Sequence, residues 1–298
     1  MPGFICIGIS TLDNFWFVPT IPSEPTKVFA LSHTQTGGGM AANAAVAIAK
    51  LGGATEFWGR AGNDLAGRTM REMFAAEAIN IEGYRLFNNA QSPVSAILVD
   101  ENGERLISTF RGSNLPDNAE WLPLHRLATS RVVLADMRWL DGALAGFREA
   151  RNRDVITVLD ADLAEAENFD RLLPLTDHAV FSEPGLSQYA PGLSVDDALE
   201  KARSAGCSLA AVTLGSEGCR WLDANGYADC ASFDVDVVDT TGAGDVFHGA
   251  YAYALGHDHA IADAMRFAAA AAAMKCRSAG GRAGSPTLGE LTQFLADK

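Results

Sequence analysis

The sequence predicts an α/β fold, in which helices cover both faces of a central, mostly parallel sheet and a small β-sheet forms a lid. From about residue 130 to 215, short apolar segments alternate with amphipathic helical ones, the pattern of a parallel sheet buried on both faces. A run of three glycines at 37–39 opens an alanine-rich helix. Asn102-Gly103 lies between two β-rich runs outside this alternation, which indicates a hairpin.

The individual elements follow from local patterns. The uninterrupted apolar run 4–9 predicts a buried strand. Residues 15–32 alternate loosely and contain three prolines, as expected for an edge strand pair. Further strands are expected at 55–58, 95–100, 105–110, 132–135, 155–159, 179–182, 210–214, 219–222 and 232–237. Helices are expected at 40–51, 64–77, 142–151, 164–173, 194–205, 246–255, 260–274 and 288–296. No repeat or linker interrupts the chain, so we expect one domain over 1–298, with lid segments at about 12–35 and 93–113.

Composition narrows the class of protein. The 298 residues are 48% hydrophobic and 20% charged, enough to bury a large core. The net charge of −14 opposes binding to phosphate backbones, so no nucleic-acid partner is expected. There is neither a long apolar segment nor a basic leader followed by an apolar core, which predicts a cytoplasmic protein without a membrane partner. Five dispersed cysteines without a Cys-x-x-Cys pair predict free thiols rather than disulfides or a zinc site.

The sharpest local feature is the segment 239–245, Asp-Thr-Thr-Gly-Ala-Gly-Asp, which runs directly into an apolar helix. Glycines at a helix N-terminus leave backbone N–H groups free to bind an anion, and the helix dipole adds to their effect. The field of the helix is expected to keep Asp245 ionised. A carboxylate beside an anion hole suits phosphoryl transfer to an alcohol. The alternative is that Asp245 only caps the helix and that the glycines only form a tight turn.

Two other glycine-rich segments are candidate ligand sites. Residues 37–43, Gly-Gly-Gly-Met-Ala-Ala-Asn, permit close approach of a ligand to the backbone and present Asn43, or they simply join the lid to the sheet. Residues 213–218 form a glycine-containing turn at the carboxyl end of a strand, where α/β sheets bind ligands. No Gly-x-x-x-x-Gly-Lys-[Ser/Thr] occurs, which excludes a P-loop.

Taken together, Asp13, the pair Gly38-Gly39 followed by Asn43, and the segment 239–245 resemble the ribokinase-like (PfkB) carbohydrate kinases over essentially the whole chain. The resemblance implies a ribokinase-like fold, ATP and Mg²⁺ as cofactors, a sugar substrate, and a homodimer formed through the lid. It also implies site residues. Asp245 would be the catalytic base, with Gly242, Ala243 and Gly244 as the anion hole. Asp13, Gly38, Gly39 and Asn43 would bind sugar hydroxyls. Thr213, Gly215 and Gly218 would bind the nucleotide, while Asp239 and Thr241 would hold a monovalent cation, usually K⁺.

One departure concerns the metal. Many members of the family have an Asn-x-x-Glu motif that supports Mg²⁺, and this chain has Ser182-Glu183-Pro184-Gly185 at that point. Glu183 is therefore the remaining metal candidate, acting through water.

Within the family, segments 134–139, 181–185, 235–238 and 276–284 are most similar to the 6-deoxy-6-sulfofructose kinases. Those enzymes hold the sulfonate with a lysine, an arginine and an asparagine, and Lys27, Arg138 and Thr109 stand at the matching positions here. Independently of the resemblance, Arg138 follows a predicted strand and so should face the ligand crevice. Arg105 and Arg111 on the hairpin are further candidate cations. The alternatives are that Arg138 pairs with Asp136 or Asp141, and that Lys27 is a solvated surface charge.

The predicted function is ATP-dependent phosphorylation of a hydroxyl, at C1, of a fructofuranose-like sugar with an anion at C6. Three alternatives stay open. The acceptor is fructose, ribose or a ketodeoxy sugar acid; or it is a nucleoside such as adenosine; or the chain is a non-catalytic sugar-binding regulator on the same fold.

Overall fold

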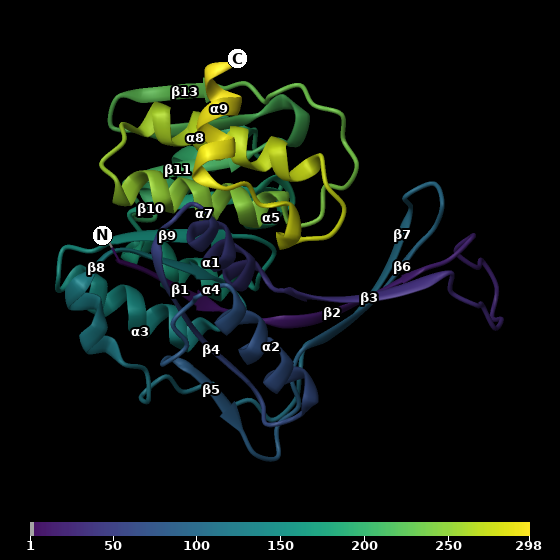
Figure 1. The fold of residues 1–298 in the computed structure, drawn as a ribbon. Coiled ribbons are helices and arrows are strands. Elements are labelled where there is room, and N and C mark those ends of the chain that lie inside the picture. The colour runs from purple at the N-terminus through teal and green to yellow at the C-terminus, as the bar shows by residue number, and fades with distance from the viewer. Residues whose placement is uncertain (1–2) are drawn as a thin grey trace.

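The computed structural model describes residues 3–298, and its body is one large twisted sheet (Figure 1). Within these residues the sheet has nine strands in the order β13-β12-β11-β10-β9-β8-β1-β4-β5. The strands from β11 to β5 are parallel, and β12 and β13 extend the sheet in antiparallel fashion. Their bounds are β1 (Gly3–Gly8), β4 (Ala54–Gly62), β5 (Tyr84–Phe87), β8 (Ser130–Asp136), β9 (Ile156–Ala161), β10 (His178–Ser182), β11 (Leu209–Thr213), β12 (Cys219–Asp223) and β13 (Gly226–Cys230).

Helices cover both faces of this sheet, and a separate apolar core fills each side. Phe57, Phe74 and Tyr251 belong to one core, and Trp139 and Phe147 to the other. The first face carries α1 (Met40–Lys50), α2 (Leu65–Ala76), α7 (Ala243–Gly256), α8 (Ile261–Cys276) and α9 (Leu288–Ala296). The second carries α3 (Leu140–Arg151), α4 (Ala166–Leu172), α5 (Glu183–Tyr189) and α6 (Val195–Ser204). The predicted α/β architecture is thereby confirmed.

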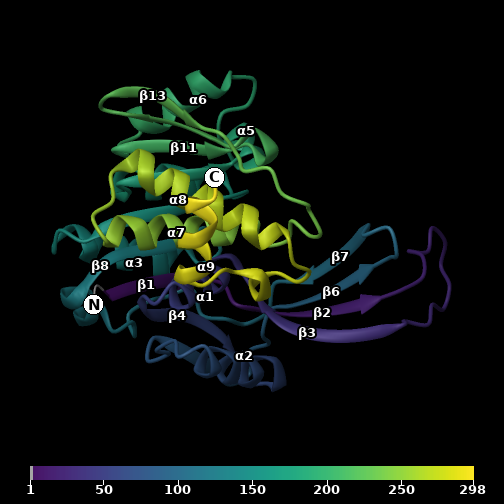
Figure 2. The same cartoon turned by 45° about the horizontal axis from the view of Figure 1, so that its top comes forward.

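A second, four-stranded sheet projects from the body, as both views show (Figures 1 and 2). Its order is β3 (Ser32–Gly38), β2 (Thr11–Phe17), β6 (Val94–Val99) and β7 (Arg105–Phe110). We call this sheet, with its connecting loops, the lid. Alternation along each strand gives it two faces, an inner one that includes Asp13, Ser95 and Thr109 and an outer one that includes Trp16 and Leu98.

Three details differ from the sequence predictions. The strand expected at 232–237 is wrong: the chain there is irregular, and β13 lies earlier, at 226–230. Asn225-Gly226 makes the tight turn that pairs β13 with β12, and Gly226 takes a φ of 108°, which favours glycine. Strand β5 and helix α5 were not expected. The predicted pair at 15–32 is shifted, because its strands are β2 and β3 and the proline-containing segment 18–31 is the loop between them.

The topology brings the carboxyl ends of β1, β8, β9, β10 and β11 to one edge of the large sheet. Ligands of open α/β sheets bind at this edge. No helix among residues 3–298 combines the length and apolar character needed to cross a bilayer.

Candidate active site

The N-termini of α1 and α7 meet at this edge. The two helices pack closely because Gly249 of α7 has no side chain; a Cβ there would lie 2.6 Å from the carbonyl oxygen of Ala44. The approach places Asn43 beside Asp245, and Nδ2 of Asn43 donates a hydrogen bond to Oδ2 of Asp245 at 2.7 Å. Oδ1 of Asn43 is buried and accepts no hydrogen bond from any described residue, so it is available to a ligand hydroxyl.

Asp245 has the electrostatics of a base that works near neutral pH. Burial and the nearby Asp160 carboxylate raise the pKa of Asp245 to about 7, against the effect of the hydrogen bond from Asn43. Burial therefore opposes the helix field that was expected to keep this carboxylate ionised. A pKa close to the working pH suits a general base.

Asp136 connects three segments around the site. This buried carboxylate accepts the backbone N–H of Ile9 at 2.9 Å and that of Ala41 at 3.1 Å on Oδ2, and that of Arg138 at 2.9 Å on Oδ1. It thus fixes the end of β1, the first turn of α1 and the residue after β8 relative to one another. Sequence reasoning treated Asp136 only as a local partner for the Arg138 side chain.

Asp160 pairs with Asp136 across β8 and β9 and is also buried. Burial and the Asp136 carboxylate raise the pKa of Asp160 well above its usual value. Its Oδ1 lies 3.5 Å from Nε2 of His248, and Nδ1 of His248 lies 2.7 Å from the carbonyl oxygen of Gly244. This chain of polar groups reaches the first turn of α7 from beneath. The signal for it was a carboxylate at the end of an apolar strand.

Unpaired backbone N–H groups lie beside Asp245. Gly242 takes the left-handed conformation, with a φ of 76°, and turns the chain into α7. The sequence analysis placed Ala243 in the anion hole with Gly242 and Gly244. In the structure, the N–H of Ala243 instead donates to the carbonyl oxygen of Thr240 at 3.1 Å. In the part of the chain that the structure describes, no acceptor binds the N–H groups of Gly242 and Gly244. Free N–H groups at a helix N-terminus can bind an anion.

The inner face of the lid presents a polar row toward the body. Asp13 on β2 is in register with Ser95 on β6, which is in register with Thr109 on β7. The hydroxyls of Ser95 and Thr109 are 3.3 Å apart. Burial raises the pKa of Asp13 to about 6. A Cβ at Gly38 would lie 1.9 Å from Oδ2 of Asp13, so the glycine is needed for the carboxylate to occupy this position.

A polar cavity of about 330 Å³ lies between the end of β7 and the carboxyl end of β8. Arg138, from the carboxyl end of β8, and Arg111, from the end of β7, both line it. The Arg138 guanidinium is paired with Asp162 at 3.0 Å, rather than with Asp136 or Asp141. The other lining residues are Ile9, Met137, Leu163, Ala164, Glu165, Asn168 and Gln188.

Lys27 lies apart from these groups. It is exposed in the loop between β2 and β3, which forms the outer end of the lid (Figure 1). Among residues 3–298, no carboxylate pairs with it. The structure does not bring Lys27 together with Arg138 in this arrangement of the lid.

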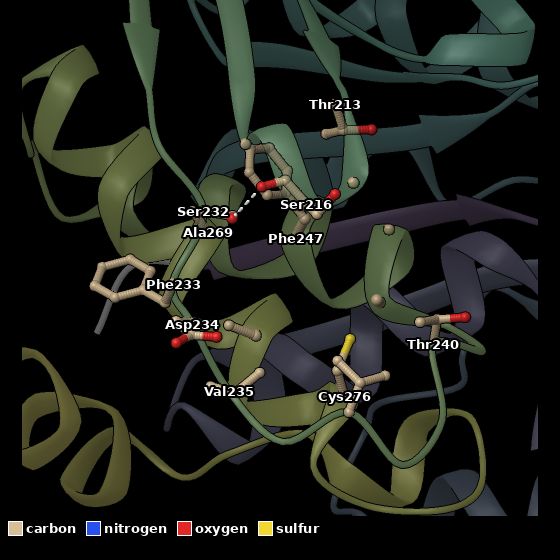
Figure 3. A pocket seen from close by; sticks show the side chains of 16 residues that line it. Thr213, Ser216, Ser232, Phe233, Asp234, Val235, Thr240, Phe247, Ala269 and Cys276 are labelled. Atoms are coloured by element: carbon tan, nitrogen blue, oxygen red, sulfur yellow. Dashed lines mark hydrogen bonds between the residues drawn. The ribbon is translucent and has the colours of Figure 1, made fainter.

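A second cavity, which Gly244 helps to line, has a volume of about 700 Å³, the size of a nucleotide site (Figure 3). Thr213, Gly215 and Gly218, which the sequence analysis assigned to the nucleotide, line this cavity. Gly215 leaves open space around its Cα, which permits a ligand to approach the backbone. Gly218 is needed for packing as well, because a Cβ there would lie 2.0 Å from the carbonyl oxygen of Cys230.

Sequence reasoning missed one wall of this cavity. Ser232, Phe233, Asp234 and Val235 run along one side of it, with Thr240 and Cys276 farther along (Figure 3). This is the segment expected to be a strand. Ser232 Oγ donates to the carbonyl oxygen of Ser216 and thereby fixes the wall to the turn after β11.

The protein offers few ligands for a Mg²⁺ ion that is bound to the nucleotide. Glu183 is exposed in the first turn of α5, at the carboxyl end of β10. Ser182 caps that helix and donates to Oδ1 of Asp162 at 2.8 Å. Residues 3–298 contain no group of three metal-ligating side chains. Because Mg²⁺ in kinases binds phosphates and one or two carboxylates, Glu183 is compatible with the ion.

Asp239 and Thr241 do not fit a monovalent cation. Oδ1 of Asp239 lies 2.9 Å from Nη1 of Arg105, which reaches over from the lid and also contacts the Thr241 hydroxyl. The ammonium of Lys275 donates to the backbone oxygen of Asp239 at 2.7 Å. Arg105 thus contacts both proposed ligands, and Lys275 contacts Asp239.

Comparisons with known proteins agree with this geometry. A profile of the "pfkB family carbohydrate kinase" matches residues 1–288. The chain is 29% identical to an aminoimidazole riboside kinase of Salmonella typhimurium, covering 97% of both chains, and 29% identical to a ribokinase of Haemophilus influenzae with the same coverage. The crystal structure of a candidate ribokinase from Agrobacterium tumefaciens superimposes with a TM-score of 0.94 at 33% identity, covering 99% of this chain and 98% of that one.

Fold, site and relatives define a phosphotransferase that uses an alcohol group as acceptor. The chain belongs to the pfkB family of carbohydrate kinases, and it is an ATP-dependent sugar or nucleoside kinase with a ribokinase-like fold. The family and the fold predicted from the sequence are confirmed.

Proposed function

We propose that this kinase transfers the γ-phosphoryl group of ATP to the C1 hydroxyl of a fructofuranose-like sugar that carries an anion at C6, with 6-deoxy-6-sulfofructose as the first candidate. The observation that carries this choice is the cavity shared by Arg111 and Arg138 beside the first turn of α1. A guanidinium offers paired donors that suit a sulfonate or phosphate.

In the proposed reaction, Asp245 takes the proton of the acceptor hydroxyl. The hydroxyl oxygen forms a bond to the γ-phosphorus, the bond to the β,γ-bridging oxygen breaks, and ADP leaves. The N–H groups of Gly242 and Gly244 bind the transferring phosphoryl and stabilise its charge. Mg²⁺ would neutralise charge on the phosphates when bound, and Glu183 would hold it through water.

Support for the sugar orientation comes from the groups around Asp245. Asn43 would donate to Asp245 and accept a sugar hydroxyl on its free Oδ1. Asp13 and the backbone at Gly38 and Gly39 would bind further hydroxyls from the lid side. Thr109, through its hydroxyl, would donate one hydrogen bond to the C6 anion. Lys27 would reach that anion only after the lid moves or from a second copy of the chain.

A second candidate acceptor is ribose, because the ribokinase of Haemophilus influenzae is 29% identical over 97% of this chain. Ribose has no anionic group at the far end of the ring. With ribose as substrate, Arg138 would keep its pairing with Asp162 as a structural contact.

We also propose that the lid mediates a homodimer. Its outer face carries a groove lined by apolar side chains: Trp16, Val18, Val28, Ala30, Ala96 and Leu98. Trp16 is 40% exposed and the neighbouring Leu106 is 51% exposed, which is costly for a monomer in water. Sedimentation should show a dimer that Trp16→Glu dissociates. A monomeric wild type would overturn the proposed homodimer.

The cytoplasmic location stays a prediction.

The test of the proposed substrate is ATP-dependent ADP release with a panel of sulfofructose, fructose 6-phosphate, fructose, ribose and adenosine. We expect the kcat/KM for sulfofructose to exceed that for fructose by about 100-fold, as a charge-assisted contact of a few kcal/mol provides. Arg138→Gln should remove most of this preference and leave fructose turnover within about threefold. Arg131→Gln, which removes a surface arginine paired with Asp258, is the matched control.

Preference for a neutral sugar would overturn the role of Arg138 and favour ribose or fructose as acceptor. Sugar binding without turnover of any member of the panel would favour the non-catalytic regulator.

A further inference from the structure

Lys275 is a fully buried lysine in α8, a helix that is otherwise rich in alanine. Its ammonium donates to the backbone oxygen of Asp239 at 2.7 Å and lies 3.8 Å from Oδ2 of the same residue. Burying an ammonium is costly unless it is paired and hydrogen-bonded. A lysine in this place therefore calls for an explanation by what it holds.

Lys275 holds the loop that leads into the anion hole. The N–H groups of Val238 and Asp239 donate to the carbonyl oxygen of Cys276 at 2.8 and 3.1 Å. The ammonium of the preceding residue binds the Asp239 oxygen in return. The end of α8 thus clamps the loop from both sides, three residues before Gly242 turns it into α7.

The Asp239 carboxylate already accepts three donors and lies within 3.8 Å of the Lys275 ammonium. Oδ1 accepts the N–H of Thr241 at 2.8 Å and lies 2.9 Å from Arg105, and Oδ2 accepts the N–H of Gly280 at 2.9 Å. A metal cation here would be repelled by both Lys275 and Arg105, which already balance the charge of this carboxylate.

We propose that the ammonium of Lys275 replaces the monovalent cation expected at Asp239 and Thr241, so that catalysis by this kinase does not depend on K⁺. Lys275 is a positioning residue: it keeps the loop 238–242, and through it the N–H groups of Gly242 and Gly244, in place. The proposal rests on the assignment of those groups as the anion hole but not on the identity of the sugar.

The first test uses the wild-type protein, so no variant has to fold. The kcat/KM of any sugar that is turned over, and the affinity for ADP, are measured in KCl and in choline chloride at equal ionic strength. We expect both to differ by less than about threefold, and the melting temperature to be the same within about 2 °C. A larger gain in K⁺ in any of these would overturn the proposal. Because ADP affinity and melting need no sugar, an error in the proposed substrate leaves this test intact.

The second test removes the ammonium. Lys275→Ala should lower kcat by about tenfold or more in choline chloride, and K⁺ or methylammonium should restore part of the loss by entering the vacated space. Lys275→Met, which fills the space, should show the loss without the rescue. Lys201→Met is the matched control, since Lys201 also donates to a backbone oxygen, that of Tyr189 at 2.7 Å, away from the site. Folded Lys275→Ala with unchanged kcat would overturn the positioning role.

Discussion

Replacing Asn43 by alanine tests how the site sets the basicity of Asp245. The variant removes the 2.7 Å hydrogen bond that opposes the high pKa of this carboxyl group. A hydrogen bond to a charged group contributes about 1.5–3 kcal/mol, and one pKa unit corresponds to about 1.4 kcal/mol, so its loss should raise the pKa of Asp245 by about 1–2 units. The deprotonated fraction at pH 7 should fall about 5- to 50-fold, because a base is inactive below its pKa.

The assay is the pH dependence of kcat/KM. For the wild type, activity should be lost as the pH falls through about 7. For Asn43→Ala, the same loss should occur about 1–2 pH units higher, with most of the activity regained in alkaline solution. A lost sugar contact would lower kcat/KM equally at every pH. The pH at which activity falls therefore distinguishes an effect of Asn43 on the pKa of Asp245 from a contact of Asn43 with the sugar.

Asn63→Ala is the matched control, because Nδ2 of Asn63 donates to Oδ1 of Asn88 at 2.9 Å on the surface. Its profile should equal that of the wild type. An acid limb that stays in place, or moves to lower pH, in Asn43→Ala would refute the reasoning.

Three further predictions concern the cavity, the lid and the charge. Gly244→Ala should leave the melting temperature unchanged or higher, since alanine favours a helix by about 0.5–1 kcal/mol and its Cβ meets nothing within 4 Å. The KM for ATP should rise, because the methyl group enters the nucleotide cavity. A melting temperature lower by several degrees would contradict this prediction. Arg105→Ala removes a partly exposed ion pair with Asp239 that joins the lid to the body, so the melting temperature should change little. The KM for the sugar should rise, and proteolysis of the lid should become faster. Unchanged proteolysis would argue against a role of this ion pair in holding the lid. The KM for an anionic sugar should rise with ionic strength while that for fructose stays constant, and equal responses would remove the role of the cations.

The segments with strong local patterns were predictable from the sequence. Residues 239–245 predicted a turn into a helix, and α7 begins at Ala243, three residues before the expected start at 246. Short apolar runs predicted the parallel strands because each strand is buried on both faces. Strand β12 was predicted, but its partner was placed at 232–237 instead of at β13, although Asn225-Gly226 signals the tight turn between them.

The pairings across the site could not be predicted, because they join residues that are distant along the chain. Arg105 and Asp239 are 134 positions apart, and Asn43 and Asp245 are 202 apart. Lys275 directly follows the helix expected at 260–274, and only the fold places Asp239 against it. The basicity of Asp245 likewise depends on burial and on Asp160, which the local helix pattern does not contain.

The most direct test of the account is Asp245→Asn, measured for both turnover and ligand affinity. If Asp245 is the base, kcat should fall by about 10²–10⁴-fold while the affinity for sugar and ADP changes by less than about threefold. Asp263→Asn, in the first turn of α8, is the control for a mere helix cap and should leave kcat unchanged. Turnover by Asp245→Asn within about tenfold of the wild type would contradict the central claim.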